Sequence, residues 1–126
     1  MILEELRKYI DMVEDEWHND QLFEMARIGA GRHGIENIII WVGAAPKTHG
    51  LRVKVSNFPN KMRIEDSFNI MMPSLDYDPS QVASWITPKI MNKILEWIKL
   101  NQQLLSDYEN GIIWDTDEFL NNISKV

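Results

Sequence analysis

The chain contains no cysteine among its 126 residues. This absence excludes disulfide bonds, thiolate metal ligands and cysteine nucleophiles, and it favours a reducing compartment, because small extracellular domains commonly depend on disulfides. Long apolar runs are also missing: the longest spans Ile38 to Ala45, whereas a membrane helix needs about 20 residues. The N-terminus lacks the basic start and apolar stretch of a signal peptide. We therefore expect a cytoplasmic protein that makes no use of a membrane.

The rest of the composition is typical of a globular protein, with 44% hydrophobic and 25% charged residues. The length is typical of one domain and is sufficient to bury a hydrophobic core without disulfide cross-links. No internal repeat, low-complexity tract or linker-like change in composition divides the chain. We expect residues 1–126 to form a single domain.

Acidic residues are absent from one long stretch and concentrated in another. The first 20 residues carry seven acids against two bases, a net charge of −5 within a whole-chain total of −6. Such asymmetry informs about partners rather than about fold. Residues 37–64 contain no Asp or Glu, and their cations are Lys47, Arg52, Lys54, Lys61 and Arg63.

Hydrophobic spacing predicts helices in the first part of the chain. An amphipathic helix is expected where apolar residues recur at intervals of three and four, at Leu3, Leu6, Ile10, Val13 and Trp17. A second helical stretch is expected from Gln21 to Ile28. Three glycines follow at positions 29, 31 and 34, and Gly29 is expected to end the helix as its C-cap.

Three strands are expected next, at Ile35 to Val42, Leu51 to Ser56 and Ser67 to Met72. In the middle one, Val53 and Val55 should face the core, with Arg52 and Lys54 pointing outward. Residues 73–87 form the longest irregular stretch, and loops of that length are often functional.

Two more helices are expected at the C-terminal end. The first should begin at the N-cap Thr87 with Pro88 in its first turn, run on to Tyr108 and stop at Gly111. The second should begin near Asp115. The predicted fold is therefore α+β: a three-stranded antiparallel β-meander packed with N-terminal and C-terminal helices, in the order α-α-β-β-β-α-α.

Two motifs invite a chemical interpretation. Residues 29–34 match the dinucleotide pattern G-x-G-x-x-G, but the pattern should follow a strand and open a helix, and the opposite order is expected here. A glycine-rich turn is the favoured interpretation. The three histidines, His18, His33 and His49, lack the i, i+4 spacing that places two ligands on one helix face, so we expect no metal site and no cofactor.

The basic segment 47–63 is the more informative feature. Its cations could contact phosphates, with Phe58 adding a stacking surface. His49 lies beside Lys47 and Arg52 and could act as a general base on an anionic substrate, although no partner nucleophile is evident. Alternatively, these charges simply solvate an outer sheet face, or they pair with the acidic first helix of the same chain.

The acidic helix allows two interpretations as well. A row of carboxylates could bind a basic partner, or the charges could simply solvate the helix. Tryptophans at 85 and 114 lie outside the strongest apolar stripes, and exposure there would indicate a protein interface. The acidic positions that would form the partner-binding face are Asp11, Glu14, Asp15 and Glu16.

Two stretches resemble a group of small proteins of no established activity found in bacteria, prophages and phages. One is PKTHGLRVKVSN (residues 46–57), which has a Pro-x-x-His sequence before a strand, and the other is ILEWIKLN (residues 94–101) followed by Leu104 and Leu105. The resemblance covers about residues 46 to 123. It implies a small accessory protein, often phage-borne and then acting in the host cytoplasm, and it makes His49, Arg52 and Lys54 the first positions to test.

The leading hypothesis is a non-enzymatic interaction protein, encoded by a phage or prophage, that binds a host or phage macromolecule. An inhibitor of a host defence complex and a virion component are two concrete forms. A nucleic-acid-binding module using residues 47–63 is the alternative, and a small hydrolase centred on His49 is the second. A protein partner is expected, with nucleic acid as the alternative. The candidate binding residues are Lys47, His49, Arg52, Lys54, Lys61 and Arg63.

Overall fold

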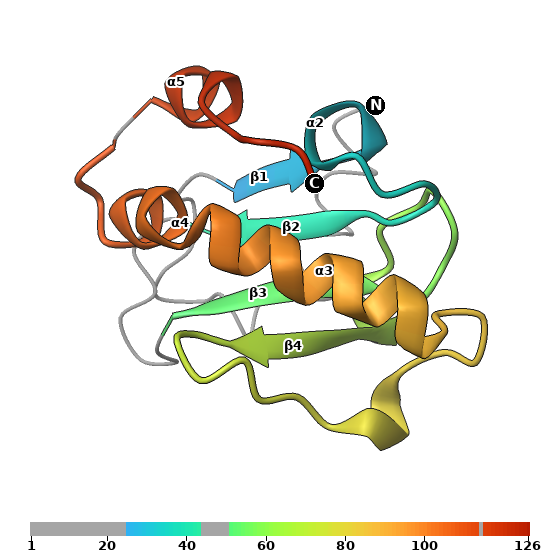
Figure 1. The fold of residues 1–126 in the computed structure, drawn as a ribbon. Coiled ribbons are helices and arrows are strands. Elements are labelled where there is room, and N and C mark those ends of the chain that lie inside the picture. Colours follow the sequence, from blue (N-terminus) through green and yellow to red (C-terminus); the bar gives the residue numbers. More distant parts are fainter. Residues whose placement is uncertain (1–24, 44–50, 114) are drawn as a thin grey trace, which may run out of the picture.

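The computed structural model describes residues 25–43, 51–113 and 115–126. Their fold is α+β: one antiparallel sheet of four strands in the order β1-β2-β3-β4, with the helices α3 and α4 lying across one of its faces (Figure 1). The predicted first helix, including Asp11, Glu14, Asp15 and Glu16, lies outside the described residues, and so do Lys47 and His49.

The sheet is a meander in which each strand pairs with the next along the chain. Its strands are β1 (Met25–Ile28), β2 (Ile40–Gly43), β3 (Arg52–Ser56) and β4 (Ser67–Met71). The three predicted strands are confirmed with shifted ends, while the sheet has a fourth strand, β1, that the sequence interpretation missed. Side chains alternate as expected in β3, where Val53 and Val55 are buried while Arg52 and Lys54 are half-buried.

The prediction of a helix from Gln21 to Ile28 is wrong for its described part, because Met25–Ile28 form β1. Its residues favour a helix locally, but pairing with β2 (Ala26 with Val42, Ile28 with Ile40) buries Ala26 and Ile28 in the core. Tertiary pairing thus outweighs local propensity over so short a segment. The helix that follows, α2 (Ala30–His33), has Gly29 as its N-cap and not as a C-cap, and Gly34 with φ 86° ends it.

Two of the C-terminal helices begin where the sequence predicts. In α3 (Pro88–Leu100), the Thr87 hydroxyl accepts a hydrogen bond from the Ile90 amide, and in α5 (Thr116–Asn121) the Asp115 carboxylate accepts one from the Asp117 amide. Gly111 adopts a left-handed φ of 78° two residues after the last helical residue of α4 (Gln102–Glu109).

The expected single helix from Pro88 to Tyr108 is two helices, α3 and α4, separated at Asn101. The buried Asn101 side chain donates hydrogen bonds to the carbonyls of Trp97 and Ser124, both at 3.0 Å, and accepts one from the Ser124 amide at 2.8 Å. These bonds join the helix break to the last residues of the chain. Apolar spacing continues through the break, so periodicity alone does not reveal it.

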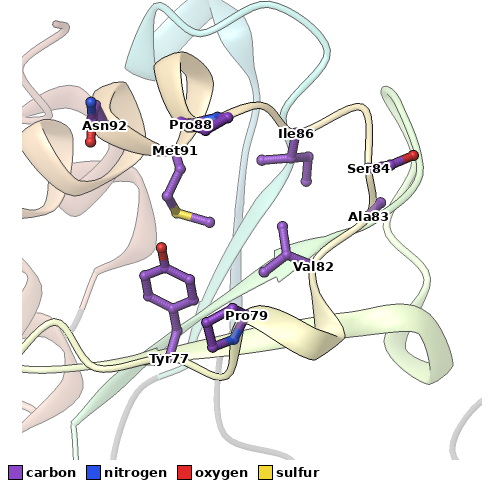
Figure 2. Close-up of a pocket in the computed structure, with 9 residues that line it drawn as sticks. All are labelled: Tyr77, Pro79, Val82, Ala83, Ser84, Ile86, Pro88, Met91 and Asn92. Atoms are coloured by element: carbon purple, nitrogen blue, oxygen red, sulfur yellow. The ribbon is translucent and has the colours of Figure 1, made fainter.

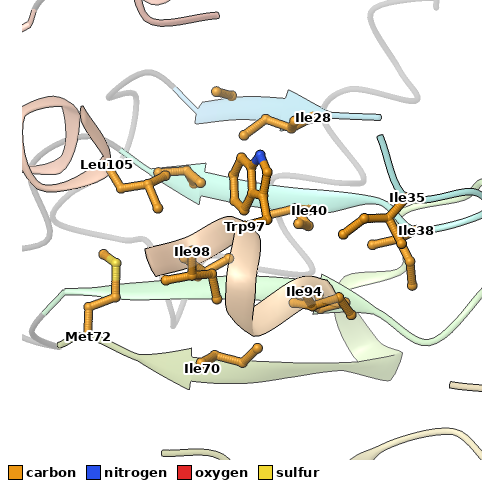
Figure 3. Packing of buried hydrophobic residues seen from close by; sticks show 14 of the residues in the cluster. Ile28, Ile35, Ile38, Ile40, Ile70, Met72, Ile94, Trp97, Ile98 and Leu105 are labelled. Carbon is orange, nitrogen blue, oxygen red and sulfur yellow. The ribbon is translucent and has the colours of Figure 1, made fainter. Parts of the chain in front are cut away.

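The core lies between the sheet and the α3–α4 pair. Figure 3 shows Trp97, Ile94 and Ile98 of α3 pointing at the strands, with Ile28 and Ile40 among the side chains that they meet. Trp97 is fully buried, and its ring makes an edge contact with the His33 ring at 6.1 Å between centroids. Phe119 of α5 stacks on Tyr108 of α4 at 4.1 Å, which fixes the last helix to the core.

Candidate functional site

His33, the histidine of the glycine motif, is occupied by structural hydrogen bonds. Its Nδ1 atom accepts a bond from the Ile35 amide at 2.9 Å, so the proton must sit on Nε2, which donates to the Ile38 carbonyl at 2.8 Å. Burial lowers the pKa of this imidazole below its usual 6.5. His33 is therefore a neutral core histidine with no ring nitrogen left for catalysis or metal binding.

The glycine motif does follow a strand and open a helix, contrary to the expected order. However, α2 has only four residues, and β1 pairs antiparallel with β2. A dinucleotide site uses a long helix between two parallel strands. The segment therefore works as a tight connection, as the favoured interpretation had it, though between two strands and not between a helix and a strand.

A metal centre has no support in the part of the chain that is described. No group of three or more His, Asp or Glu side chains there is placed to hold an ion. His18 and His49 lie outside that part. The general-base role expected of His49 is accordingly untested by the geometry.

An open groove lies between residues 77–86 and the first turns of α3, with a volume of about 290 Å³. Figure 2 shows the Tyr77 hydroxyl pointing toward Met91, with Val82 and Ile86 on the opposite side. Apart from Tyr77, none of its lining residues is titratable. The groove is therefore lined by apolar side chains together with the polar groups of Tyr77, Ser84 and Asn92, among which only the Tyr77 hydroxyl can exchange a proton.

The cations of β3 point to the sheet face opposite α3 and α4, which we call the second face. Strand pairing aligns Arg27, Trp41, Lys54 and Asn69 in one row across all four strands, since each is the register partner of the next. Arg52 and Met71 form a neighbouring pair. The second face thus includes Arg27, Trp41, Arg52, Lys54, Asn69 and Met71.

The remaining two cations of the basic segment lie in the turn between β3 and β4, near an exposed aromatic ring. The Arg63 guanidinium stacks over the Phe58 ring at 4.9 Å from its centroid, and Phe58 is 37% exposed. Lys61 pairs with Phe58 through a β-bridge. Across the sheet end, Arg27 donates a hydrogen bond to the Asn60 carbonyl at 3.4 Å. We name Arg27, Phe58, Lys61 and Arg63 the turn patch.

Arg27 is the member of the turn patch that sequence reasoning missed. Arg27 lies next to Asn60 only because residues 25–28 form strand β1 and pair with β2, whereas the sequence predicted a helix there. All four members of the turn patch are exposed, and an acid lies close to one of them: Glu65, 3.6 Å from Arg63. Because both side chains of that pair are about half exposed, the ion pair stabilises little and leaves Arg63 available.

The Ser56 hydroxyl positions the backbone of the turn patch. It is fully buried, accepts hydrogen bonds from the amides of Phe58 (3.1 Å) and Arg63 (3.3 Å), and donates one to the Lys61 carbonyl. One side chain therefore fixes the backbone at three of the four patch positions.

Asn57 ties the same turn to the long loop before α3. Its amide nitrogen donates to the Asp66 carboxylate at 2.9 Å and to the Gln81 carbonyl at 2.8 Å, and its oxygen accepts from the Ala83 amide at 2.8 Å. The half-buried Trp85 donates its indole N–H to the Asn57 carbonyl at 2.7 Å. Trp85 thus serves the loop scaffold, and Trp114 lies outside the described residues.

We expect Ser56→Ala to lower the free energy of unfolding by about 1–3 kcal/mol, because buried backbone groups lose their partners. Ser67→Ala is the matched control: Ser67 faces Ser56 across the strands and donates a single bond to the Ile64 carbonyl at 3.0 Å. Urea titration should show a loss of about 1 kcal/mol or less for the control. Equal losses in the two variants would contradict the role given to Ser56.

Glu109 is the one strongly perturbed acid of the described chain. It is 1% exposed, its Oε2 accepts a hydrogen bond from the Arg52 amide at 3.2 Å, and its Oε1 has no hydrogen-bond partner. Burial raises the pKa of the carboxyl to about 8, against the opposing effects of the Arg52 amide and the Arg52 charge. Glu109 is therefore protonated at neutral pH and joins α4 to the start of β3.

Comparison with protein-family models, curated proteins and solved structures yields no match for this chain. Among the described residues, no helix is both long enough and apolar enough to cross a membrane.

Proposed function

We propose that the chain is a non-enzymatic interaction protein whose turn patch binds an acidic segment of a protein partner. The observation that carries this proposal is the Arg63–Phe58 stack at 4.9 Å, exposed beside Lys61 and Arg27. Aromatic and arginine side chains are enriched in protein interfaces and dominate their binding energy. The expectation of a phage or prophage source, and of a host defence complex or virion as the setting, rests on the sequence resemblance alone.

Charge favours a protein over a nucleic acid as the partner. The whole chain carries a net charge of −6, which repels any anionic partner at long range and a densely charged nucleic acid most strongly. The turn patch supplies only three cations, one of them beside Glu65. A short acidic protein segment needs only these few contacts, whereas nucleic-acid binding usually rests on a broad basic surface.

The turn patch also has rigidity, which favours recognition. Ser56 and Asn57 hold its backbone through buried side-chain hydrogen bonds, so little ordering is needed when a partner binds.

The test is an affinity pull-down from host lysate with the tagged full chain and two double variants. Lys61→Gln/Arg63→Gln removes two charges from the turn patch, and Lys93→Gln/Lys99→Gln removes two exposed charges from α3. We expect a stoichiometric partner to bind wild type and the α3 variant, and at least tenfold less of it to bind the patch variant. Equal recovery with both variants would overturn the proposal.

Nucleic acid remains the second candidate, because Phe58 and Arg63 offer a stacking surface beside cations. A parallel pull-down from nuclease-treated lysate separates the two. Partners that vanish after nuclease treatment, together with a binding constant for single-stranded DNA that falls steeply with salt and less steeply in Lys61→Gln/Arg63→Gln, would favour this candidate. The hydrolase hypothesis depends on His49, and retained turnover in His49→Ala would exclude it.

A further inference from the structure

The groove beside α3 adjoins the turn patch through a single stretch of chain. Residues 82–84 line the groove. Asn57 holds the same stretch, because its side chain accepts a hydrogen bond from the Ala83 amide at 2.8 Å, and Asn57 directly precedes Phe58 of the turn patch. An extended segment advances about 3.3 Å per residue, so one short ligand segment has the reach to contact the turn patch and the groove together.

The groove is suited to apolar side chains of a longer ligand. Its described lining residues carry no charge, and Val82, Ile86 and Met91 present apolar side chains to it (Figure 2). The Tyr77 hydroxyl points toward Met91 and offers a hydrogen bond beside them. The volume of about 290 Å³ is at the lower limit of the roughly 300–1,000 Å³ of most small-molecule sites. One or two aliphatic side chains therefore fit the groove better than a cofactor does.

Charges around the groove decide where the carboxylates of a ligand lie. Asp76 and Asp78 flank Tyr77 in the chain and are both exposed, so this end of the groove repels carboxylates. The exposed Lys89 and Lys93 of α3 are not among the lining residues. Cations lie at the turn patch instead, where an arginine stacks on an aromatic ring. A ligand with carboxylates at the turn patch therefore binds best when it extends uncharged side chains into the groove.

We propose that the partner segment carries two elements: carboxylates that contact the turn patch and, a few residues away, an apolar anchor that occupies the groove. The inference rests on the proposed function, since the carboxylates are those that Lys61 and Arg63 bind. The anchor packs against Val82, Ile86 and Met91 and supplies binding energy that exposed cations lack. The carboxylates give orientation and speed of association. The partner is recognised by an acidic stretch beside a short aliphatic one.

Two synthetic peptides of equal charge test the inference on the full chain. Both have a central Asp-Glu-Asp-Glu with a Gly-Ser linker on each side, and they end on both sides either in two leucines or in two serines, so either chain direction reaches the groove. Fluorescence anisotropy at low salt should show the leucine peptide binding at least fivefold more tightly, a factor that burial of half a leucine side chain supplies. Equal affinities would overturn the inference, and the proposed function would still stand if Lys61→Gln/Arg63→Gln weakened both peptides. Binding of neither peptide to wild type would overturn the proposed function and the inference with it.

Ala83→Trp tests where the leucines bind. Ala83 is half-buried and lines the groove, whereas Ser74 is an exposed residue of the same loop outside it. We expect Ala83→Trp to bind both peptides with the wild-type affinity for the serine peptide, which also shows that its turn patch is folded, and Ser74→Trp to keep the fivefold difference. In wild type, the amide NMR signals of Val82 and Ile86 should shift with the leucine peptide and not with the serine peptide. A fivefold preference that persists in Ala83→Trp, or signals that stay unchanged in wild type, would overturn the inference.

Discussion

Glu109→Gln is expected to remove a large pH dependence of stability. The carboxyl has a pKa of about 8 in the folded protein against about 4.5 when exposed, so the folded state binds more protons than the unfolded state between these values. Stability is then full below pH 4.5 and falls as the pH rises toward 8, by about 1.4 kcal/mol per pH unit and on the order of 5 kcal/mol in total.

Glutamine keeps an acceptor for the Arg52 amide but has no proton to lose. We therefore expect Glu109→Gln to match wild type within about 1 kcal/mol at pH 5 and to be several kcal/mol more stable at pH 9, measured by urea unfolding at each pH. His33 acts in the opposite direction, because its lowered pKa removes stability as the pH falls below 6.5. The His33 effect is the same in wild type and in Glu109→Gln, so it cancels when their free energies of unfolding are subtracted. If that difference in unfolding free energy stayed constant from pH 5 to pH 9, the role given to Glu109 would be contradicted.

Trp97→Ala is expected to cost about 3–5 kcal/mol of unfolding free energy, since it opens a large cavity at the centre of the core. Trp97 is fully buried between α3 and the sheet and contacts the His33 ring (Figure 3). Because the free energy of unfolding of a domain of this size is only about 5–15 kcal/mol, the variant should lose much of its stability. Urea unfolding followed by far-ultraviolet circular dichroism measures the loss.

Trp97→Phe is the control that separates the loss of ring volume from the loss of the indole N–H. The indole N–H of Trp97 is buried without a partner, so phenylalanine removes an unsatisfied donor while keeping much of the apolar contact. We expect it to cost less than half as much as Trp97→Ala. Equal costs would show that ring packing does not account for the stability that Trp97 provides.

Sequence patterns predicted those strands and helices that are specified by residues within the element itself or at its caps. The strand at 52–56 was found from strict alternation, and the helices at 88 and 116 from Thr87 and Asp115, whose side chains cap them. The same reasoning failed at Met25–Ile28 and at Asn101. A four-residue strand has too few positions for its period to show, and Asn101 ends α3 through a partner 23 residues away.

The residues of the candidate site likewise fall into some that the sequence indicated and others that only the structure revealed. Sequence charge pointed to Lys61 and Arg63, and composition pointed to Phe58, but nothing local placed Arg27 beside Asn60 or identified Ser56 as the residue that holds the turn. Lys54 and Arg52 were predicted as outward-facing cations, and the register added their neighbours Trp41 and Met71.

By itself, the sequence determined the α+β class, three of the four strands, the starts of α3 and α5 and the separation of acidic from basic residues. These depend on side chains within a few positions of one another. Only the tertiary structure decided the fourth strand, the break at Asn101, the neutral state of His33 and the raised pKa of Glu109. Each of these depends on which distant groups pair or exclude water, and burial and pairing are properties of the folded chain.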